Sequence, residues 1–97
     1  MGLLTFEEKV GTLTELEELL NNDLQKRLIL INDDVNSLDW VVESLMKVCR
    51  HSAEQAEQCA LITHTKGKYA VKTAPMWELL GMKEGLETRG LLCEIDE

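Results

Sequence analysis

The chain has 97 residues, of which 44% are hydrophobic and 29% are charged, a composition typical of a globular protein with one small core. This balance excludes a disordered chain and a disulfide-dense one. With 10 basic and 18 acidic residues, the net charge of −8 disfavours binding to nucleic acid or to an anionic membrane. We therefore expect a partner that carries positive charge or an apolar anchor.

Signals for membrane insertion and export are weak. No segment reaches the roughly 18 apolar residues of a membrane span, and the first ten residues lack the basic start of a secretory signal. Gly2 fits a myristoylation start, but Phe6 stands where such a site requires Ser or Thr. We expect a cytoplasmic protein that needs no cofactor.

The three cysteines favour free thiols in a reducing compartment, because they are odd in number and form no Cys-x-x-Cys pair. A zinc site that combines Cys49 and Cys59 with His51 and His64 matches no common ligand spacing. We expect no metal site.

Residues 1–24 differ from the rest of the chain. They are rich in acidic residues, and their only apolar stripe is formed by leucines at positions 13, 16, 19 and 20. An isolated amphipathic helix of this length has little stability of its own. We expect residues 1–24 to form a mobile acidic extension and residues 25–97 to form the folded domain.

The domain begins with a strand and a helix. The run RLILI at 27–31 is typical of a buried strand, and the Asn-Asp-Asp that follows predicts a turn. Asn36 or Ser37 then provides a helix N-cap, with Asp39 in the first turn. Helical spacing places six apolar residues on one face: Leu38, Val41, Val42, Leu45, Met46 and Cys49.

The second half of the chain adds two helices and two strands. Ser52 and Gln55 predict the start of a second helix that ends at Lys66 before Gly67, and its inner face carries small residues. A strand over 68–73 follows, then a third helix that begins near Pro75, is weakened by two glycines and stops at Gly90, and a last strand over 91–95. The order β-α-α-β-α-β predicts an α+β sandwich, in which a three-stranded antiparallel sheet is covered by three helices.

The polar turn after the first strand has three interpretations. It is a solvated turn by default. Oxygen-bearing side chains at Asn32, Asp34, Asn36 and Glu43 follow part of a calcium-loop pattern, but Ser37 occupies the position that requires Gly, and no helix precedes the loop. In the third interpretation, His64 approaches the turn from the end of the second helix, beside a hole lined by apolar residues. Those apolar residues are Leu38, Val41 and Ala60, which taken singly are equally typical of a core.

Two blocks of the sequence resemble the ClpS adaptors of bacterial and organellar Clp proteases. They are LINDDVNSLDWVVESLMKV and AEQAEQCALITHTKGK, which match the family in a strand, an Asn-Asp-Asp turn, a hydrophobic helix and a His-x-x-Gly end. The ending LLCEI is also similar to the last strand of the family. The resemblance covers about residues 25–97 and implies the same β-α-α-β-α-β fold, which the C-terminal domain of the ribosomal stalk protein shares.

The resemblance implies a function without catalysis. Members of the family bind substrate proteins by the free α-amino group and the bulky first residue of an N-degron, and pass them to the N-terminal domain of a Clp-family AAA+ unfoldase. Carried over to this chain, Asn32, Asp34 and His64 would bind the amine, with Asp33 as a further candidate. The residues implied for the hydrophobic pocket and its flank are Leu38, Val41, Ala60, Thr63, Leu91 and Asn36.

The chain departs from the family at several points. Leu38 and Ala60 stand where methionine is common, so the pocket should be roomier and, besides Leu, Phe, Tyr and Trp, should accept Ile or Val as a first residue. The third-helix region matches too loosely to carry over the docking surface for the unfoldase, and residues 1–24 lack the basic, proline-containing junction common in the family.

Two rival functions remain at this stage. A hydrolase would use His64 as base with Asp33 or Asp34, and Thr63 or Cys59 would have to serve as nucleophile. A general interaction domain of the ribosomal-stalk type would bind partners without regard to a free amine.

Overall fold

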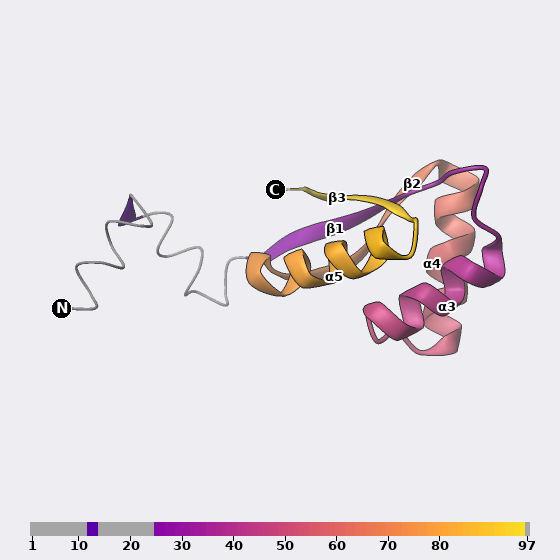
Figure 1. Cartoon of the computed structure of the whole chain (residues 1–97), viewed down its shortest axis with the longest axis horizontal. Coiled ribbons are helices and arrows are strands. Elements are labelled where there is room, and N and C mark those ends of the chain that lie inside the picture. The colour runs from indigo at the N-terminus through magenta and orange to yellow at the C-terminus, as the bar shows by residue number, and fades with distance from the viewer. Residues whose placement is uncertain (1–11, 14–24, 97) are drawn as a thin grey trace.

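The computed structural model describes residues 12–13 and 25–96, and Figure 1 shows how their elements are arranged. The predicted extension over residues 1–24 lies outside the described residues, apart from Thr12 and Leu13. The predicted order β-α-α-β-α-β is confirmed. The elements are β1 (Gln25–Ile31), α3 (Leu38–Val48), α4 (Ala53–Lys66), β2 (Lys68–Pro75), α5 (Met76–Thr88) and β3 (Leu92–Asp96).

The three strands form one antiparallel sheet in the order β2-β1-β3, as expected of the predicted fold class. The central strand β1 pairs with both neighbours, so its end is fixed from two sides. It begins two residues earlier than predicted, because Gln25 and Lys26 pair with Pro75 and Ala74 of β2.

The core lies between the sheet and the helices. In Figure 1, α5 runs alongside the sheet, while α3 and α4 pack against each other near the end of β1. The buried core side chains come from all six elements and from the turn before β3: Leu28, Leu30, Leu45, Cys49, Ala56, Cys59, Val71, Ala74, Leu79, Leu86, Leu91 and Cys93. Met46, at the margin of the predicted stripe of α3, is 40% exposed. Within residues 12–13 and 25–96, no helix is long and apolar enough to cross a membrane.

Asp33 holds the turn between β1 and α3 in place. Its Oδ1 accepts hydrogen bonds from the backbone N–H groups of Val35 (2.8 Å) and Asn36 (2.7 Å), and its Oδ2 accepts one from Nδ2 of Asn36 (2.9 Å). Partial desolvation of the carboxylate is outweighed by these bonds from Asn36 and Val35, so the pKa of Asp33 is lowered. Of the two predicted N-caps, Ser37 is the one used, since its Oγ accepts from the backbone N–H of Trp40 at 3.2 Å.

The end of α4 is joined directly to the end of β1. Gly67 closes the helix with a φ of 93°, and its N–H donates to the carbonyl of Thr63 at 2.8 Å. The carbonyl of Gly67 in turn accepts the backbone N–H of Asn32 at 2.8 Å. This bond sets the first residue after β1 beside the last turn of α4, which carries His64.

The end of α5 places Leu91 in the core. The N–H of Gly90 donates to the carbonyl of Glu87 (2.9 Å) and that of Leu91 to the carbonyl of Leu86 (3.0 Å), the pattern of a Schellman motif. Gly90 has a φ of 86°, and Leu86 and Leu91 are both buried, as is common for the apolar pair that accompanies this motif. The last strand therefore begins at Leu92, one residue later than predicted.

The two glycines inside α5 differ in their surroundings. A Cβ on Gly85 would lie 2.9 Å from a methyl group of Val48, so this glycine lets α5 and α3 approach closely. A Cβ on Gly81 would have no heavy atom within 4 Å. The sequence predicted a helix weakened at both positions. Packing against α3 explains the glycine at position 85 but not the one at position 81.

We predict opposite effects of two Gly→Ala substitutions on stability. Gly67→Ala forces a side chain into a left-handed backbone conformation and should lower the free energy of unfolding by about 1–2 kcal/mol. The control Gly81→Ala, inside an exposed stretch of helix, should raise it by about 0.5–1 kcal/mol. Urea denaturation of both variants measures the difference, and equal stabilities would contradict the role of Gly67.

We predict that Asp33 and its neighbour Asp34 contribute differently to stability. Asp33→Ala removes three hydrogen bonds from the turn and should lower the free energy of unfolding at pH 7 by about 1–2 kcal/mol. Because the pKa of Asp33 is lower in the folded chain, its contribution is present above about pH 4 and is lost as the pH falls through the folded value. Asp34→Ala should change the stability by less than about 0.5 kcal/mol. Chemical denaturation at pH 7 and pH 3 tests both, and similar losses at pH 7 would refute this distinction.

Candidate functional site

A pocket of about 250 Å³ lies where β1, the turn after it, α3 and α4 meet; it is called the main pocket below. It brings together all ten residues that the sequence marked as a candidate site. Its lining consists of Leu30, Ile31, Asn32, Asp33, Asp34, Asn36, Leu38, Val41, Ala60, Thr63, His64 and Leu91. The sequence analysis missed Leu30 and Ile31, because nothing in the pattern of the strand distinguishes them from its other apolar residues.

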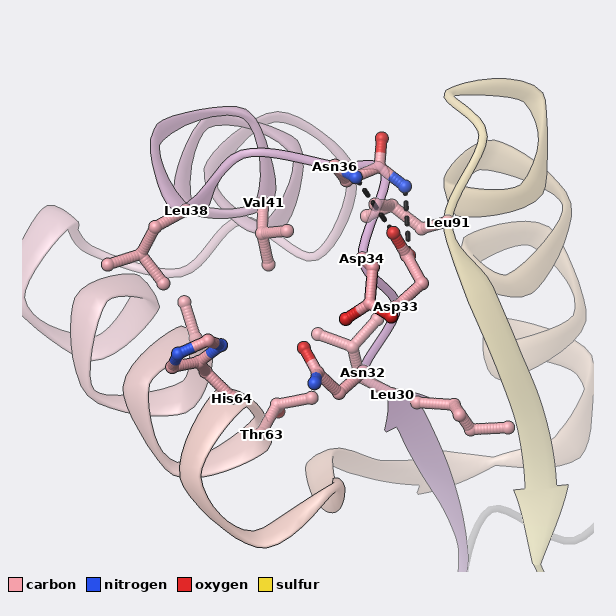
Figure 2. A pocket seen from close by; sticks show the side chains of 12 residues that line it. Leu30, Asn32, Asp33, Asp34, Asn36, Leu38, Val41, Thr63, His64 and Leu91 are labelled. Atoms are coloured by element: carbon pink, nitrogen blue, oxygen red, sulfur yellow. Dashed lines mark hydrogen bonds between the residues drawn. The ribbon is translucent and has the colours of Figure 1, made fainter.

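Three polar side chains form the lip of the main pocket. In Figure 2, the amide of Asn32 and the ring of His64 lie on facing sides of the opening, and the carboxylate of Asp34 is turned toward it. In the part of the chain that the structure describes, none of these three side chains takes part in a hydrogen bond or an ion pair. The lip therefore offers an amide oxygen, a carboxylate and an imidazole nitrogen as acceptors for a ligand.

The other two polar residues of the pocket are used by the fold itself. Figure 2 shows the carboxylate of Asp33 turned toward Asn36, with which it makes the bonds described above. Nδ2 of Asn36 also donates to the carbonyl of Gly90 at 2.9 Å. Asp33 and Asn36 thus connect the turn to the segment that carries Leu91, and neither has the free hydrogen-bonding capacity of Asn32, Asp34 and His64.

The interior of the main pocket is apolar. Ala60 and Leu91 are buried, Val41 is half-buried, and Leu38 at the rim is 42% exposed. Thr63 is also buried, and its hydroxyl donates to the carbonyl of Cys59 at 2.8 Å, so the donor of this side chain is already used within α4. A ligand would meet a hydrocarbon surface beneath a polar lip.

Leu91 forms part of the wall of the main pocket, and contacts between α3 and the end of α5 fix its position. Nε1 of Trp40 donates to the carbonyl of Arg89 at 2.9 Å, and the guanidinium of Arg89 lies 4.1 Å from the centre of the Trp40 ring. Nε of Arg89 donates to Oγ of Ser44 at 2.8 Å. These contacts hold Arg89 against α3, and the bond from Asn36 holds Gly90 against the turn before α3. Leu91 follows directly, so its position is fixed as well.

Three of the residues considered for metal binding, Cys49, Cys59 and Glu43, are protonated or paired within the domain. Burial raises the pKa of the Cys49 and Cys93 thiols to about 11 and also raises that of Cys59, so these side chains stay protonated at neutral pH. Glu43, the last oxygen of the calcium-loop pattern, pairs with Lys47 (3.0 Å) and Arg89 (3.5 Å). Among residues 25–96 and the two described residues before them, no group of three or more His, Cys, Asp or Glu side chains is arranged to hold a metal ion.

The known proteins that resemble this chain include members of one family of adaptors. The family model of the ATP-dependent Clp protease adaptor protein ClpS matches residues 21–94. The ATP-dependent Clp protease adapter protein ClpS of Oleidesulfovibrio alaskensis is 37% identical over 65 residues, which cover 63% of this chain and 62% of that protein. The protein of the same name from Lawsonia intracellularis is 29% identical over 91 residues, 84% of each chain.

A solved structure supports the fold independently of close sequence similarity. The structure of Agrobacterium tumefaciens ClpS2 bound to L-phenylalaninamide matches with a TM-score of 0.68 and 19% identity, and covers 74% of this chain and 94% of that one. The family name describes adaptors of a protease and not enzymes. Because its model covers most of the sequence, this chain belongs to the ClpS family of Clp protease adaptors.

Proposed function

We propose that this chain is an N-degron adaptor: it binds the free α-amino group and the bulky hydrophobic first residue of a substrate protein and delivers that protein to a Clp AAA+ unfoldase. One observation carries the proposal. Three acceptor side chains without partners among the described residues stand at the lip of an apolar pocket.

The lip suits a protonated amine. A free α-amino group has a reference pKa of about 7.7–8.0, so at neutral pH it is mostly an ammonium with three N–H donors. Asn32 accepts through its amide oxygen, His64 through its unprotonated ring nitrogen, and Asp34 through its carboxylate, directly or by way of water. Such charge-assisted hydrogen bonds are stronger than neutral ones. Asp33 acts mainly by holding the turn that presents Asn32 and Asp34.

The pocket suits one side chain. Its volume of about 250 Å³ lies below the range of about 300–1,000 Å³ that is common for sites of whole small molecules. Leu, Phe, Tyr and Trp side chains would contact Leu38, Val41, Ala60 and Leu91. The Agrobacterium relative supports this assignment, because L-phenylalaninamide combines a free amine with an aromatic side chain.

The partners follow from the family to which the chain belongs. Residues 25–97 act as the binding domain, and residues 1–24 precede it as an extension that takes part in delivery. The second partner is the N-terminal domain of a Clp-family AAA+ unfoldase. The names of the relatives support the coarser part of this proposal, that the partner is a Clp protease. We place this activity in the cytoplasm, in keeping with three cysteines that are free thiols.

The contacts in the pocket argue against a hydrolase. The hydroxyl of Thr63 is bonded within its own helix, and the raised pKa of Cys59 leaves its thiol a poor nucleophile. An interaction domain of the stalk type would account for the fold but leaves the three acceptors at the lip without a role.

We predict that binding requires a free amine. A fluorescent peptide that begins with Phe should bind, and acetylation of its α-amino group should weaken binding by more than about 100-fold, because two or more charged hydrogen bonds are lost. Fluorescence anisotropy measures both peptides. Equal affinities would favour the stalk-type alternative and contradict the proposed function.

We predict that His64 supplies one of the acceptors for the amine. His64→Ala removes the imidazole nitrogen at the lip and should weaken binding of the Phe peptide at pH 7, because one charge-assisted hydrogen bond is lost. It should leave the affinity for the acetylated peptide unchanged. Fluorescence anisotropy measures both peptides with the variant. An unchanged affinity for the Phe peptide would count against the role of His64.

We predict that the pocket tolerates β-branched first residues. Ala60 leaves room on the wall formed by α4, so peptides that begin with Ile or Val should bind more tightly than one that begins with Ala. Ala60→Met should weaken the binding free energy of the Ile and Val peptides by about 1–3 kcal/mol. Binding of a Leu peptide should stay largely intact. A titration series that varies only the first residue tests both expectations. Ile and Val peptides no better than the Ala peptide would refute them.

A further inference from the structure

Four side chains join α3 to the end of α5; they are called the Arg89 clasp below. Trp40, Glu43 and Ser44 belong to α3, and Arg89 closes α5. The guanidinium of Arg89 stacks on the Trp40 ring, donates through Nε to Oγ of Ser44, and lies with Nη2 3.5 Å from a carboxylate oxygen of Glu43. One side chain from α5 is therefore held by three side chains of α3.

The clasp also holds the backbone in front of Leu91. Nε1 of Trp40 donates to the carbonyl of Arg89, and Nδ2 of Asn36 donates to the carbonyl of Gly90, the next residue. Leu91 comes directly after these two bonded carbonyls and lines the main pocket. Figure 2 shows it beside Asn36, on the segment that leads into β3. The position of this wall therefore depends on the hold of α3 on Arg89.

The contacts of Arg89 suit orientation better than stability. Its Nη2 is buried and has no hydrogen-bond partner among the described residues. Burial of part of a guanidinium costs free energy, and an ion pair with a half-exposed carboxylate such as that of Glu43 offsets little of it. The donors of arginine form a rigid planar fork, so contacts on several sides fix the direction of the side chain. These features favour a residue that positions the turn before Leu91.

A wall that cannot move makes a pocket selective. When a side chain fills a pocket incompletely, the loss of affinity depends on how far the walls can close on it. When a wall must be ordered during binding, a ligand that contacts more of it loses more affinity. A loosened Leu91 should therefore weaken the binding of a large first residue more than that of a smaller one.

We propose that Arg89 is a positioning residue of the main pocket: through Trp40 it fixes the wall formed by Leu91, and it thereby determines how sharply first residues of different size are discriminated. Arg89 does not line the pocket, so it acts on a substrate only through Leu91. This inference rests on the proposed function, since the first residue must occupy the main pocket.

The test uses two peptides that begin with Phe or Leu and are otherwise identical. Arg89→Met keeps a hydrocarbon side chain beside Trp40 but removes the cation and its donors. The affinity for the Phe peptide should fall about five- to tenfold, and that for the Leu peptide less than about twofold. Fluorescence anisotropy measures both. An unchanged Phe-to-Leu ratio would overturn the positioning role and leave the proposed function intact, whereas an unaltered chain that binds neither peptide would overturn both.

A matched control separates positioning from a general loss of charge or stability. Lys83 is another partly buried cation of α5, 31% exposed against 21% for Arg89, and it pairs with Glu87 of the same helix. Lys83 lines no part of the main pocket. Lys83→Met should therefore keep the Phe-to-Leu ratio. Equal changes of this ratio in Lys83→Met and Arg89→Met would overturn the proposal.

A second variant tests the clasp from α3 and serves also if Arg89→Met fails to fold. Trp40→Phe keeps an aromatic ring but removes the indole N–H that bonds to the carbonyl of Arg89. It should lower the Phe-to-Leu ratio as well, and the double variant should lower it no further than the stronger single variant, because both act through one set of contacts. An unchanged ratio in Trp40→Phe, or additive effects in the double variant, would contradict a shared clasp.

An NMR measurement without peptide follows the wall itself. The methyl resonances of Leu91 should shift in Arg89→Met. Those of Leu79, which is buried about 15 Å earlier along α5, should stay in place. Leu91 resonances that do not change would overturn the positioning role.

Discussion

The hydrogen bond from the backbone N–H of Asn32 to the carbonyl of Gly67 determines the geometry of the candidate site. It joins the end of the central strand to the end of α4, two points 35 residues apart in the sequence. Gly67 makes this possible by closing α4 in a left-handed conformation, with a φ of 93°. As a result, Asn32 and His64 face each other across one opening, although neither side chain is bonded within the described part of the chain.

The polar turn after β1 divides its residues between two tasks. Asp33 and Asn36 use their side chains to fix the turn and to tie it to Gly90, while Asn32 and Asp34 direct theirs to the opening. Within residues 32–36, side chains that are bonded within the fold thus alternate with side chains that are unbonded acceptors. The backbone that carries the acceptors is held by these bonds before a ligand arrives, which limits the ordering cost of binding.

Local signals in the sequence predicted most of the fold, because caps and periodic stripes are properties of neighbouring residues. Ser37, Ser52 and Gly67 marked helix ends correctly, and the spacing of apolar residues predicted α3. The helices α4 and α5 were predicted mainly from the residues at their ends. The site residues came instead from resemblance to a family, and the structure brings all ten into one pocket. Their roles in binding remain predictions.

Other features depend on tertiary contacts that no local pattern encodes. Leu91 was expected in a strand, yet it closes a Schellman motif and is held near α3 by the contact of Arg89 with Trp40. Leu30 and Ile31 looked like ordinary strand residues, and only the position of α4 makes them part of the pocket. The need for glycine at position 85 likewise appears only when Val48 is seen beside it.

The most direct test of the account is an NMR titration of the isotope-labelled chain with L-phenylalaninamide, which carries only a free amine and one aromatic side chain. The account predicts saturable shifts in the side-chain amide of Asn32 and the ring nitrogens of His64, together with methyl shifts of Leu38, Val41 and Leu91. Saturable binding that leaves the Asn32 and His64 side chains unshifted would contradict it.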